Sequence, residues 1–472
     1  MTSERPRPPH DQSATTLAVP RTPAPDTVPS GARTAVAAGV GTAIEWYDYG
    51  LYTIAAGLVI AKVFFPAGND QVALLATFGA FAVGFIARPV GGIVLGAASD
   101  RFGRRPVLIF SLLLVGGATT TIGLLPTYAS IGIWAPLLLM AMRVAQGFGA
   151  GAEMAGAITI ANESADSHRK SFLSSLAMGG ATLGVLTAAV LFAVVSAALS
   201  ADAFLSYGWR IPFVMSAVFT VVGILLRRTM RESPEFVEVQ HERDRGELAQ
   251  AQRNPLVAMA NAVKASPRNW IAGFLVPSGL NVTSYVTSAF AISYVTSELD
   301  LPRSQALLMT VAVFGSGFIG LLIFGRLGDA IGVRRVIFIG IAGSLALALP
   351  YVAILKTGLI VPIIVASIVM NFFGWAAGAA AHTVIMPGLF RAEYRSSGLF
   401  SSRELQGALI AGPTPLIASL LVGLSDGEPW LVAAVLAVAQ LMTLAAMFIG
   451  RPFFTAEERA VTPALQGFPS NP

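Results

Sequence analysis

Long apolar runs alternate with short polar stretches over most of this chain, six runs on either side of a polar stretch at 228–268. A helix needs about 20 residues to cross a hydrocarbon core of about 30 Å, and open backbone cannot face lipid. The pattern therefore predicts an all-α polytopic membrane protein with twelve transmembrane helices in two six-helix bundles. The predicted helices are 35–61, 72–98, 106–125, 132–162, 171–198, 210–227, 270–297, 304–328, 336–355, 358–389, 397–424 and 429–450.

The same pattern divides the chain into five parts. We expect a disordered cytoplasmic tail at 1–34, a first bundle at 35–227, a cytoplasmic linker at 228–268, a second bundle at 269–450 and a cytoplasmic tail at 451–472. The first tail is rich in Pro, Ser and Thr, and it lacks the apolar core of a signal peptide. The linker is charged and is expected to be solvated and partly helical.

Composition agrees with a membrane protein. Of the 472 residues, 54% are hydrophobic and only 12% are charged, against about 25% charged in a soluble domain. The net charge of +5 comes from basic residues in short loops, which argues against a nucleic-acid partner and predicts that both termini are cytoplasmic. The chain has no Cys, which excludes disulfides and thiol chemistry, and its four His residues form no metal-binding spacing.

An internal repeat supports two halves. The loop after the second predicted helix and the loop after the eighth both read Gly-x3-Asp-x2-Gly-x-Arg, with Asp329 placed 229 residues after Asp100. Small residues at 92 and 96 predict a close helix approach, and Asp100 can accept hydrogen bonds from a neighbouring helix end. We expect a gating role for this pair of loops, with a simple positive-inside loop as the alternative. The residues concerned are Gly96, Asp100, Arg101, Gly103, Arg104, Arg105 and Asp329.

Five charged residues lie well inside predicted helices of the first half, away from the helix ends: Glu45, Asp48, Arg88, Arg143 and Glu153. Charges in a membrane helix are unfavourable and mark ion or substrate paths by default. With three acids and two bases, one carboxylate lacks a full partner, and burial favours its protonated form. We therefore expect the three acids to take part in proton coupling, with Asp48 as the first candidate, and the two Arg to be counter-ions or anion binders. The alternative is a structural ion pair between Glu45 and Arg88.

The second half carries fewer charges. Asn281 and Tyr285 place polar groups in the seventh helix, and Trp375 and His382 lie in the tenth. We expect Asn281, Tyr285 and Trp375 to contact a polar ligand, with helix packing as the alternative and as the favoured reading for His382. Arg403 in the eleventh helix is expected to face a cavity or another helix, and Pro413 and Pro415 beyond it should bend that helix.

The loop pair, the six-plus-six pattern and the linker resemble the major facilitator superfamily. Arg143-Val-Ala-Gln146-Gly147 is similar to a motif of its proton-coupled members, which implies that Gln146 belongs to the substrate or counter-ion group. Glu45-Trp-Tyr-Asp48, Arg88-Pro-x-Gly-Gly92, Glu232-Ser-Pro-Glu-Phe236 and Asn281-Val-Thr-x-Tyr285 resemble the metabolite:proton symporter branch. Arg403-Glu404 departs from the aromatic-Asn pair that is frequent there, so the resemblance does not carry over any particular substrate.

The resemblance implies a proton-coupled symporter that imports a small polar metabolite, an organic acid or an osmolyte, by alternating access in the cell membrane. It implies protons, the metabolite and lipid as partners, a monomer, and no cofactor beyond the proton gradient. The alternatives are a proton-driven exporter of drugs or metabolites on the same fold, a membrane enzyme, which no catalytic arrangement in the sequence supports, and a ligand sensor.

Overall fold

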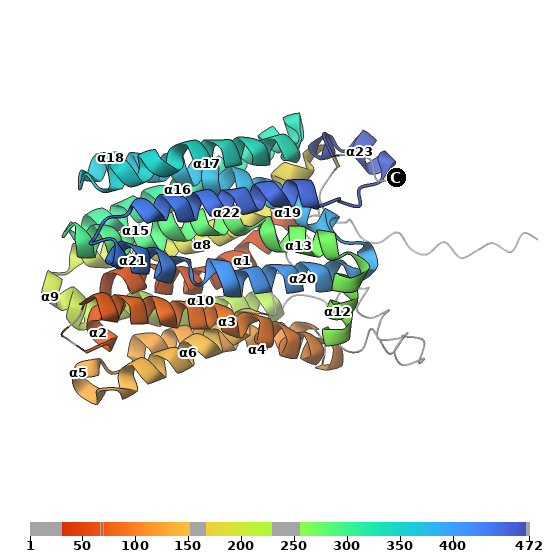
Figure 1. The fold of residues 1–472 in the computed structure, drawn as a ribbon. Helices are drawn as coiled ribbons and strands as arrows, with labels where there is room; N and C mark the ends of the chain where they lie inside the picture. The colour runs from red at the N-terminus through yellow and green to blue at the C-terminus, as the bar shows by residue number, and fades with distance from the viewer. Residues whose placement is uncertain are drawn as a thin grey trace, which may run out of the picture.

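The computed structural model describes residues 31–66, 68, 70–102, 104–151, 167–228 and 255–468. In this part of the chain every regular element is helical, and the long helices lie side by side in one bundle (Figure 1). One end of the bundle carries α12 and the C-terminal α23 and is called the linker end. The opposite end carries α5 and α9 and is called the far end.

The first half contains one set of long helices joined by short ones. Its elements are α1 (Gly31–Ala55), η1 (Ala56–Ile60), α2 (Ala61–Phe64), α3 (Asp70–Phe102), α4 (Arg104–Leu124), α5 (Tyr128–Ile131), α6 (Trp134–Ala150), η2 (Ser167–Arg169), α8 (Lys170–Ala198), α9 (Ala201–Ala203), η3 (Phe204–Gly208) and α10 (Arg210–Arg228).

The second half follows the same plan, with more interruptions. Its elements are α12 (Pro255–Ala265), α13 (Pro267–Leu275), α14 (Ser278–Tyr285), η5 (Val286–Phe290), α15 (Ala291–Ser293), η6 (Tyr294–Glu298), α16 (Arg303–Ile331), α17 (Val333–Leu355), α18 (Ile360–Asn371), η7 (Phe372–Ala377), α19 (Gly378–Gly388), η8 (Ala392–Tyr394), α20 (Arg395–Gln406), η9 (Gly407–Ala411), α21 (Thr414–Leu424), α22 (Trp430–Ile449), α23 (Ala456–Val461) and η10 (Pro463–Leu465).

Each of the twelve predicted segments contains a helix. Among the described residues, eight spans are long and apolar enough to cross a membrane, and a ninth is a pair, Ala201–Gly208 and Arg210–Leu226, bent by 41°. The other three predicted segments also fold as helices. The first continues through the π-helical turn η1, α6 reaches the undescribed residues 152–166, and a turn separates α13 from α14.

The ends of the predicted parts differ from the structure. Helix α1 begins at Gly31, inside the expected tail, of which residues 1–30 lie outside the described chain. Helix α12 lies inside the expected linker. The expected C-terminal tail folds back on the bundle, because Leu465 is buried and Arg334 donates a hydrogen bond to the carbonyl oxygen of Gly467 at 2.7 Å.

The two halves also share a π-helical turn at corresponding positions. The π-helical turn η1 begins at Ala56 and η5 begins at Val286, close to the spacing between the two loop aspartates. A π turn widens a helix locally and is frequent at functional sites. The two halves therefore share a distortion at corresponding places in their first long helices.

At the far end, the first helix of each half closes against the other. A Cβ atom at Gly57 would lie 2.8 Å from a side-chain carbon of Ile292, so the two helices touch where the glycine leaves room. Thr296 donates its hydroxyl hydrogen to the carbonyl oxygen of Gly57 at 3.1 Å. Arg303 of α16 donates to the Ser196 hydroxyl of α8 at 3.0 Å. These contacts join the two halves at the far end.

At the linker end, Asp329 joins the last turn of α16 to the first turn of α8. Its two carboxylate oxygens accept hydrogen bonds from the backbone N–H groups of Ser171 and Phe172 at 2.8 and 3.0 Å. These N–H groups have no partner within their own helix, and the positive end of the helix dipole favours the carboxylate. A Cβ atom at Gly328 would lie 2.3 Å from the Ser171 hydroxyl oxygen, so the glycine permits the approach.

The structure describes only part of the expected gating loops. Gly103 and the side chains of Asp100, Arg101 and Arg104 lie outside the described residues, and Arg105 is exposed. The close approach expected at 92 and 96 occurs at Gly92, where a Cβ atom would lie 2.1 Å from the Phe400 ring of α20. At Gly96 no described atom lies within 4 Å of that position.

We predict that Asp329→Ala loosens the linker end. The substitution leaves two N–H groups of α8 unpaired, and hydrogen bonds to a charged group contribute about 1.5–3 kcal/mol each. In the Cys-free chain, Ser175→Cys at the buried α8–α16 contact should then react with N-ethylmaleimide at least several-fold faster. Glu393→Ala, which removes an exposed acid, is the control. Equal rates in Asp329→Ala and the control would contradict the prediction.

Candidate functional site

A buried ion pair joins the two halves inside the bundle. Arg88 of α3 donates from Nε to Glu404 Oε2 at 3.0 Å and from Nη2 to Glu404 Oε1 at 3.4 Å. The two side chains are only 6% and 5% exposed. A guanidinium and a carboxylate in this two-point geometry satisfy each other's charge and much of their hydrogen-bonding capacity. In this structure Arg88 is the counter-ion of Glu404, a residue of the other half.

This partner corrects the sequence analysis, which considered Glu45 for Arg88. Glu404 follows Arg403, and adjacent residues on a helix point in different directions. Once Arg403 is assigned to a cavity, Glu404 must turn elsewhere, and a buried acid in the eleventh helix needs a cation. This need for a cation is the sequence feature from which an ion pair of Glu404 could have been predicted.

Aromatic rings surround the Arg88 guanidinium. Its Cζ atom lies 5.1 Å from the Tyr49 ring centroid and 5.5 Å from that of Phe85, distances at which a cation is attracted to a ring face. Tyr285 of the second half packs against Phe85 with centroids 5.7 Å apart. Tyr285 therefore contributes to the contact between halves next to the ion pair, and it also lines the cavity described below.

Arg143 is fully buried within the first half. Its Nε and Nη2 atoms donate to backbone carbonyls of α3 at Ala80 and Phe81, at 3.4 and 3.3 Å, and Nη1 donates to the Gln146 side chain. Its Cζ atom lies 3.9 Å from the Tyr52 ring centroid. Arg143, expected to be a counter-ion or an anion binder, is not among the residues that line the cavity described below.

Asp48 is 1% exposed and faces α10, where the Ser216 hydroxyl donates to its carboxylate. Gln146 connects this position to Arg143, because its Nε2 atom donates to the backbone carbonyl of Asp48 at 3.2 Å. Glu45, one turn earlier on α1, is partly buried. Glu153, the third expected acid, lies outside the described residues.

A small cavity of about 40 Å³ lies between the halves. The first half contributes Trp46 of α1 and Thr182 of α8. The second half contributes five polar or amphipathic groups, which are Asn281, Ser284, Tyr285, His382 and Arg403, together with Trp375. The expected ligand contacts Asn281, Tyr285, Trp375 and Arg403 are therefore brought together, and His382 joins them. The liquid volume of one water molecule is about 30 Å³, so a metabolite requires the halves to move apart.

The break expected in the eleventh helix is present. Helix α20 passes into the π-helical turn η9, and α21 begins at Thr414. A Cβ atom at Gly412 would lie 2.6 Å from the Phe85 side chain of the first half. The interrupted helix therefore meets α3 on the far-end side of the ion pair.

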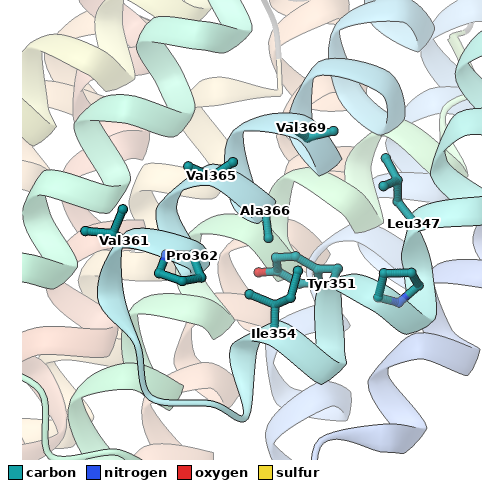
Figure 2. A pocket seen from close by; sticks show the side chains of 9 residues that line it. Leu347, Tyr351, Ile354, Val361, Pro362, Val365, Ala366 and Val369 are labelled. Atoms are coloured by element: carbon teal, nitrogen blue, oxygen red, sulfur yellow. The ribbon is translucent and has the colours of Figure 1, made fainter.

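A larger hollow of about 440 Å³ lies between α17 and α18 (Figure 2). Its lining is apolar except for the Tyr351 hydroxyl, and Val361 and Val365 are more than half exposed. A polar metabolite would find no charged or amide group there, so we do not assign it as the substrate site. Within the described ranges, no group of three or more metal-binding side chains is placed to hold a metal ion.

Comparison with known proteins agrees with this architecture. The sequence profile of the family described as "Sugar (and other) transporter" matches residues 34–458. The chain belongs to this transporter family. The shikimate transporter of Escherichia coli K12 is 34% identical over 391 residues, covering 83% of this chain and 87% of its own. The proline/betaine transporter of Salmonella typhimurium LT2 is 30% identical over 417 residues, covering 86% and 81%.

The fold is that of the major facilitator superfamily, with twelve membrane helices in two six-helix bundles. The proton:xylose symporter XylE, in a complex with 6-bromo-6-deoxy-D-glucose, superimposes with a TM-score of 0.66 and covers 92% of this chain and 99% of its own at 16% identity. The chain is thus a multi-pass membrane protein of a family of transporters. Glu404 and His382 are the residues that sequence analysis left out of its expected site.

We predict strong coupling between Arg88 and Glu404 in a double-mutant cycle. Arg88→Gln and Glu404→Gln should each lower the free energy of unfolding by about 3–5 kcal/mol, since each leaves a buried charge alone. The free energy of unfolding of the double variant should fall by much less than the sum of the two single losses. The measurement is detergent-titrated unfolding of the purified protein in mixed micelles.

The exposed pair Lys356–Glu428, with a 2.6 Å separation and side chains 47% and 39% exposed, is the control. Its coupling should stay below about 1 kcal/mol. Additive losses at Arg88 and Glu404 would contradict an energetically important pair.

Proposed function

We propose that this transporter is a proton-coupled symporter that imports a small polar metabolite, an organic acid or an osmolyte, by alternating access. The observation that carries the proposal is the cavity between the halves, lined by polar groups from both and closed at each end by contacts between the halves. In this fold, rocking of one half against the other exposes a central site to alternate sides of the membrane.

The proposal places the chain in the cell membrane as a monomer with both termini in the cytoplasm, which puts the linker end inside. The basic loops support this orientation. The partners are the metabolite, protons and lipid, with no nucleic acid, no cofactor and no enzymatic reaction. The polar and charged groups in the cavity lining favour a polar ligand over the large apolar ligands of a drug exporter.

We assign proton coupling first to Asp48. The group is a buried carboxylate in the first half, the described structure pairs it with a neutral hydroxyl, and a relay through Gln146 connects its backbone to Arg143. Removal from water makes a carboxylate easier to protonate, and protonation removes the charge that resists movement of the half. Glu45 and Glu153 remain secondary candidates.

Uptake into proteoliposomes tests the proposal. With labelled shikimate, proline and glycine betaine as trial substrates, an imposed inward proton gradient should drive accumulation of at least one of them. Collapse of that gradient with an uncoupler should abolish accumulation. Accumulation driven by a sodium gradient and indifferent to the uncoupler would contradict proton coupling.

We predict that Asp48→Asn abolishes accumulation of the transported compound and retains exchange of internal for external compound. The amide mimics the protonated carboxyl and cannot release a proton, so the halves can still move with ligand bound. Asp202→Asn, at an exposed acid of α9, should behave as the unmodified protein. Full accumulation by Asp48→Asn, with normal protein levels, would overturn its assignment.

A further inference from the structure

The wall that the second half contributes to the cavity contains polar nitrogens without partners among the described residues. His382 is 1% exposed, and neither of its ring nitrogens has a hydrogen-bond partner. Arg403 lines the same cavity, and its buried Nη1 atom also has none. Buried polar groups are nearly always paired, so these atoms require explanation.

A fourth unpaired nitrogen, on Gln406, lies behind this wall. Asn281 donates to Gln406 Oε1 at 2.8 Å, while the Nε2 atom of Gln406 is buried and unpaired. A guanidinium and an amide nitrogen only donate, and a neutral imidazole donates from one nitrogen, so donors outnumber acceptors among these unpaired atoms. A ligand that satisfies them must bring acceptor oxygens.

The charges sharpen this requirement. Both carboxylate oxygens of Glu404 accept hydrogen bonds from Arg88. Glu404 therefore pairs with Arg88 and not with Arg403. None of the residues that line the cavity is acidic. Arg403 therefore gives the cavity one positive charge, which a ligand with a single negative charge would neutralise.

The rest of the lining favours a ligand whose remaining part, apart from the carboxylate, is compact and uncharged. Trp46 of the first half and Trp375 and Phe314 of the second border the cavity. Large aromatic side chains favour the hydrocarbon part of a small ligand. A second carboxylate would meet these groups with no cation left to bind it, and a ligand ammonium would share the cavity with the Arg403 guanidinium.

We propose, resting on the transport function above, that Arg403 and His382 form the carboxylate-binding site of the cavity. The substrate is then a compact monocarboxylate with an uncharged body. Arg403 makes the charged contact, and His382 donates a second hydrogen bond from its ring. The relatives are named for shikimate, which carries one negative charge, or for proline and betaine, which are zwitterions. The proposed site favours a singly charged anion over a zwitterion.

Four probes that share a six-membered ring separate the charge types: cyclohexanecarboxylate, cyclohexanecarboxamide, cis-1,2-cyclohexanedicarboxylate and piperidine-2-carboxylate. They are a monoanion, a neutral amide, a dianion and a zwitterion. Binding to the purified full chain is measured by Trp fluorescence and thermal shift without any gradient. We expect the monoanion to bind at least tenfold more tightly than the other three. Equal or tighter binding of the zwitterion, dianion or amide, or no binding of the monoanion, overturns the proposal.

Variants assign the residues. Arg403→Gln should weaken binding of the monoanion at least tenfold, and Arg335→Gln, which removes an exposed charge outside the cavity, should leave it unchanged. If Arg403→Gln does not fold, Arg403→Lys and His382→Gln replace it. Each should weaken binding of the monoanion severalfold without strengthening binding of the zwitterion. Unchanged binding in these variants overturns the assignment.

This measurement is independent of proton coupling. A protein that binds the monoanion through Arg403 but accumulates it without a proton gradient would contradict the proposed function alone. Proton-driven accumulation of a zwitterion that Arg403→Gln leaves intact would contradict only the carboxylate site.

Discussion

The closed arrangement of the described helices depends on a buried ion pair between the two halves, Arg88 with Glu404. Two charges removed from water are tolerated only when they stay together, and these two belong to helices of different halves. While the pair is intact, α3 and α20 are held side by side at the centre. A movement that separates them must bring water or a new partner to each charge, so the pair sets an energetic threshold for opening.

The surrounding structure is arranged so that this contact can form. Gly91 lies against the backbone of α6, where a Cβ atom would come within 1.9 Å of the Phe148 carbonyl oxygen, and Gly92 faces the Phe400 ring of α20. Glycines at these positions bring α3 close to a helix of each half, since small residues permit close helix packing. Arg143 donates hydrogen bonds to two backbone carbonyl groups of α3 and so fixes this helix from its other side. The same packing leaves Arg403, next to Glu404, directed into the cavity.

Much of this fold could be predicted from the sequence, because hydrocarbon restricts a long apolar run to one conformation. The interruptions were harder to predict. The break near Pro413 was signalled by proline, but the π turns η1 and η5 have no such marker and depend on packing between the halves. The apolar runs placed Asn281, Trp375 and Arg403 within predicted helices, yet they could not show which helices are neighbours. For that reason Arg88 was considered with an acid of its own half, and the position of Arg143 outside the cavity lining could not be foreseen.

The Arg88–Glu404 pair joins α3 to α20 across the two halves, so its loss should let these helices separate. The natural absence of Cys permits spin labels at two introduced cysteines, Ala97→Cys on α3 and Ser396→Cys on α20, both exposed. Double electron–electron resonance then measures the distance between the halves. We expect one dominant short distance in the unmodified chain, and a shift of the population to longer distances in Glu404→Gln but not in Glu428→Gln. An unchanged distance distribution in Glu404→Gln would contradict this expectation.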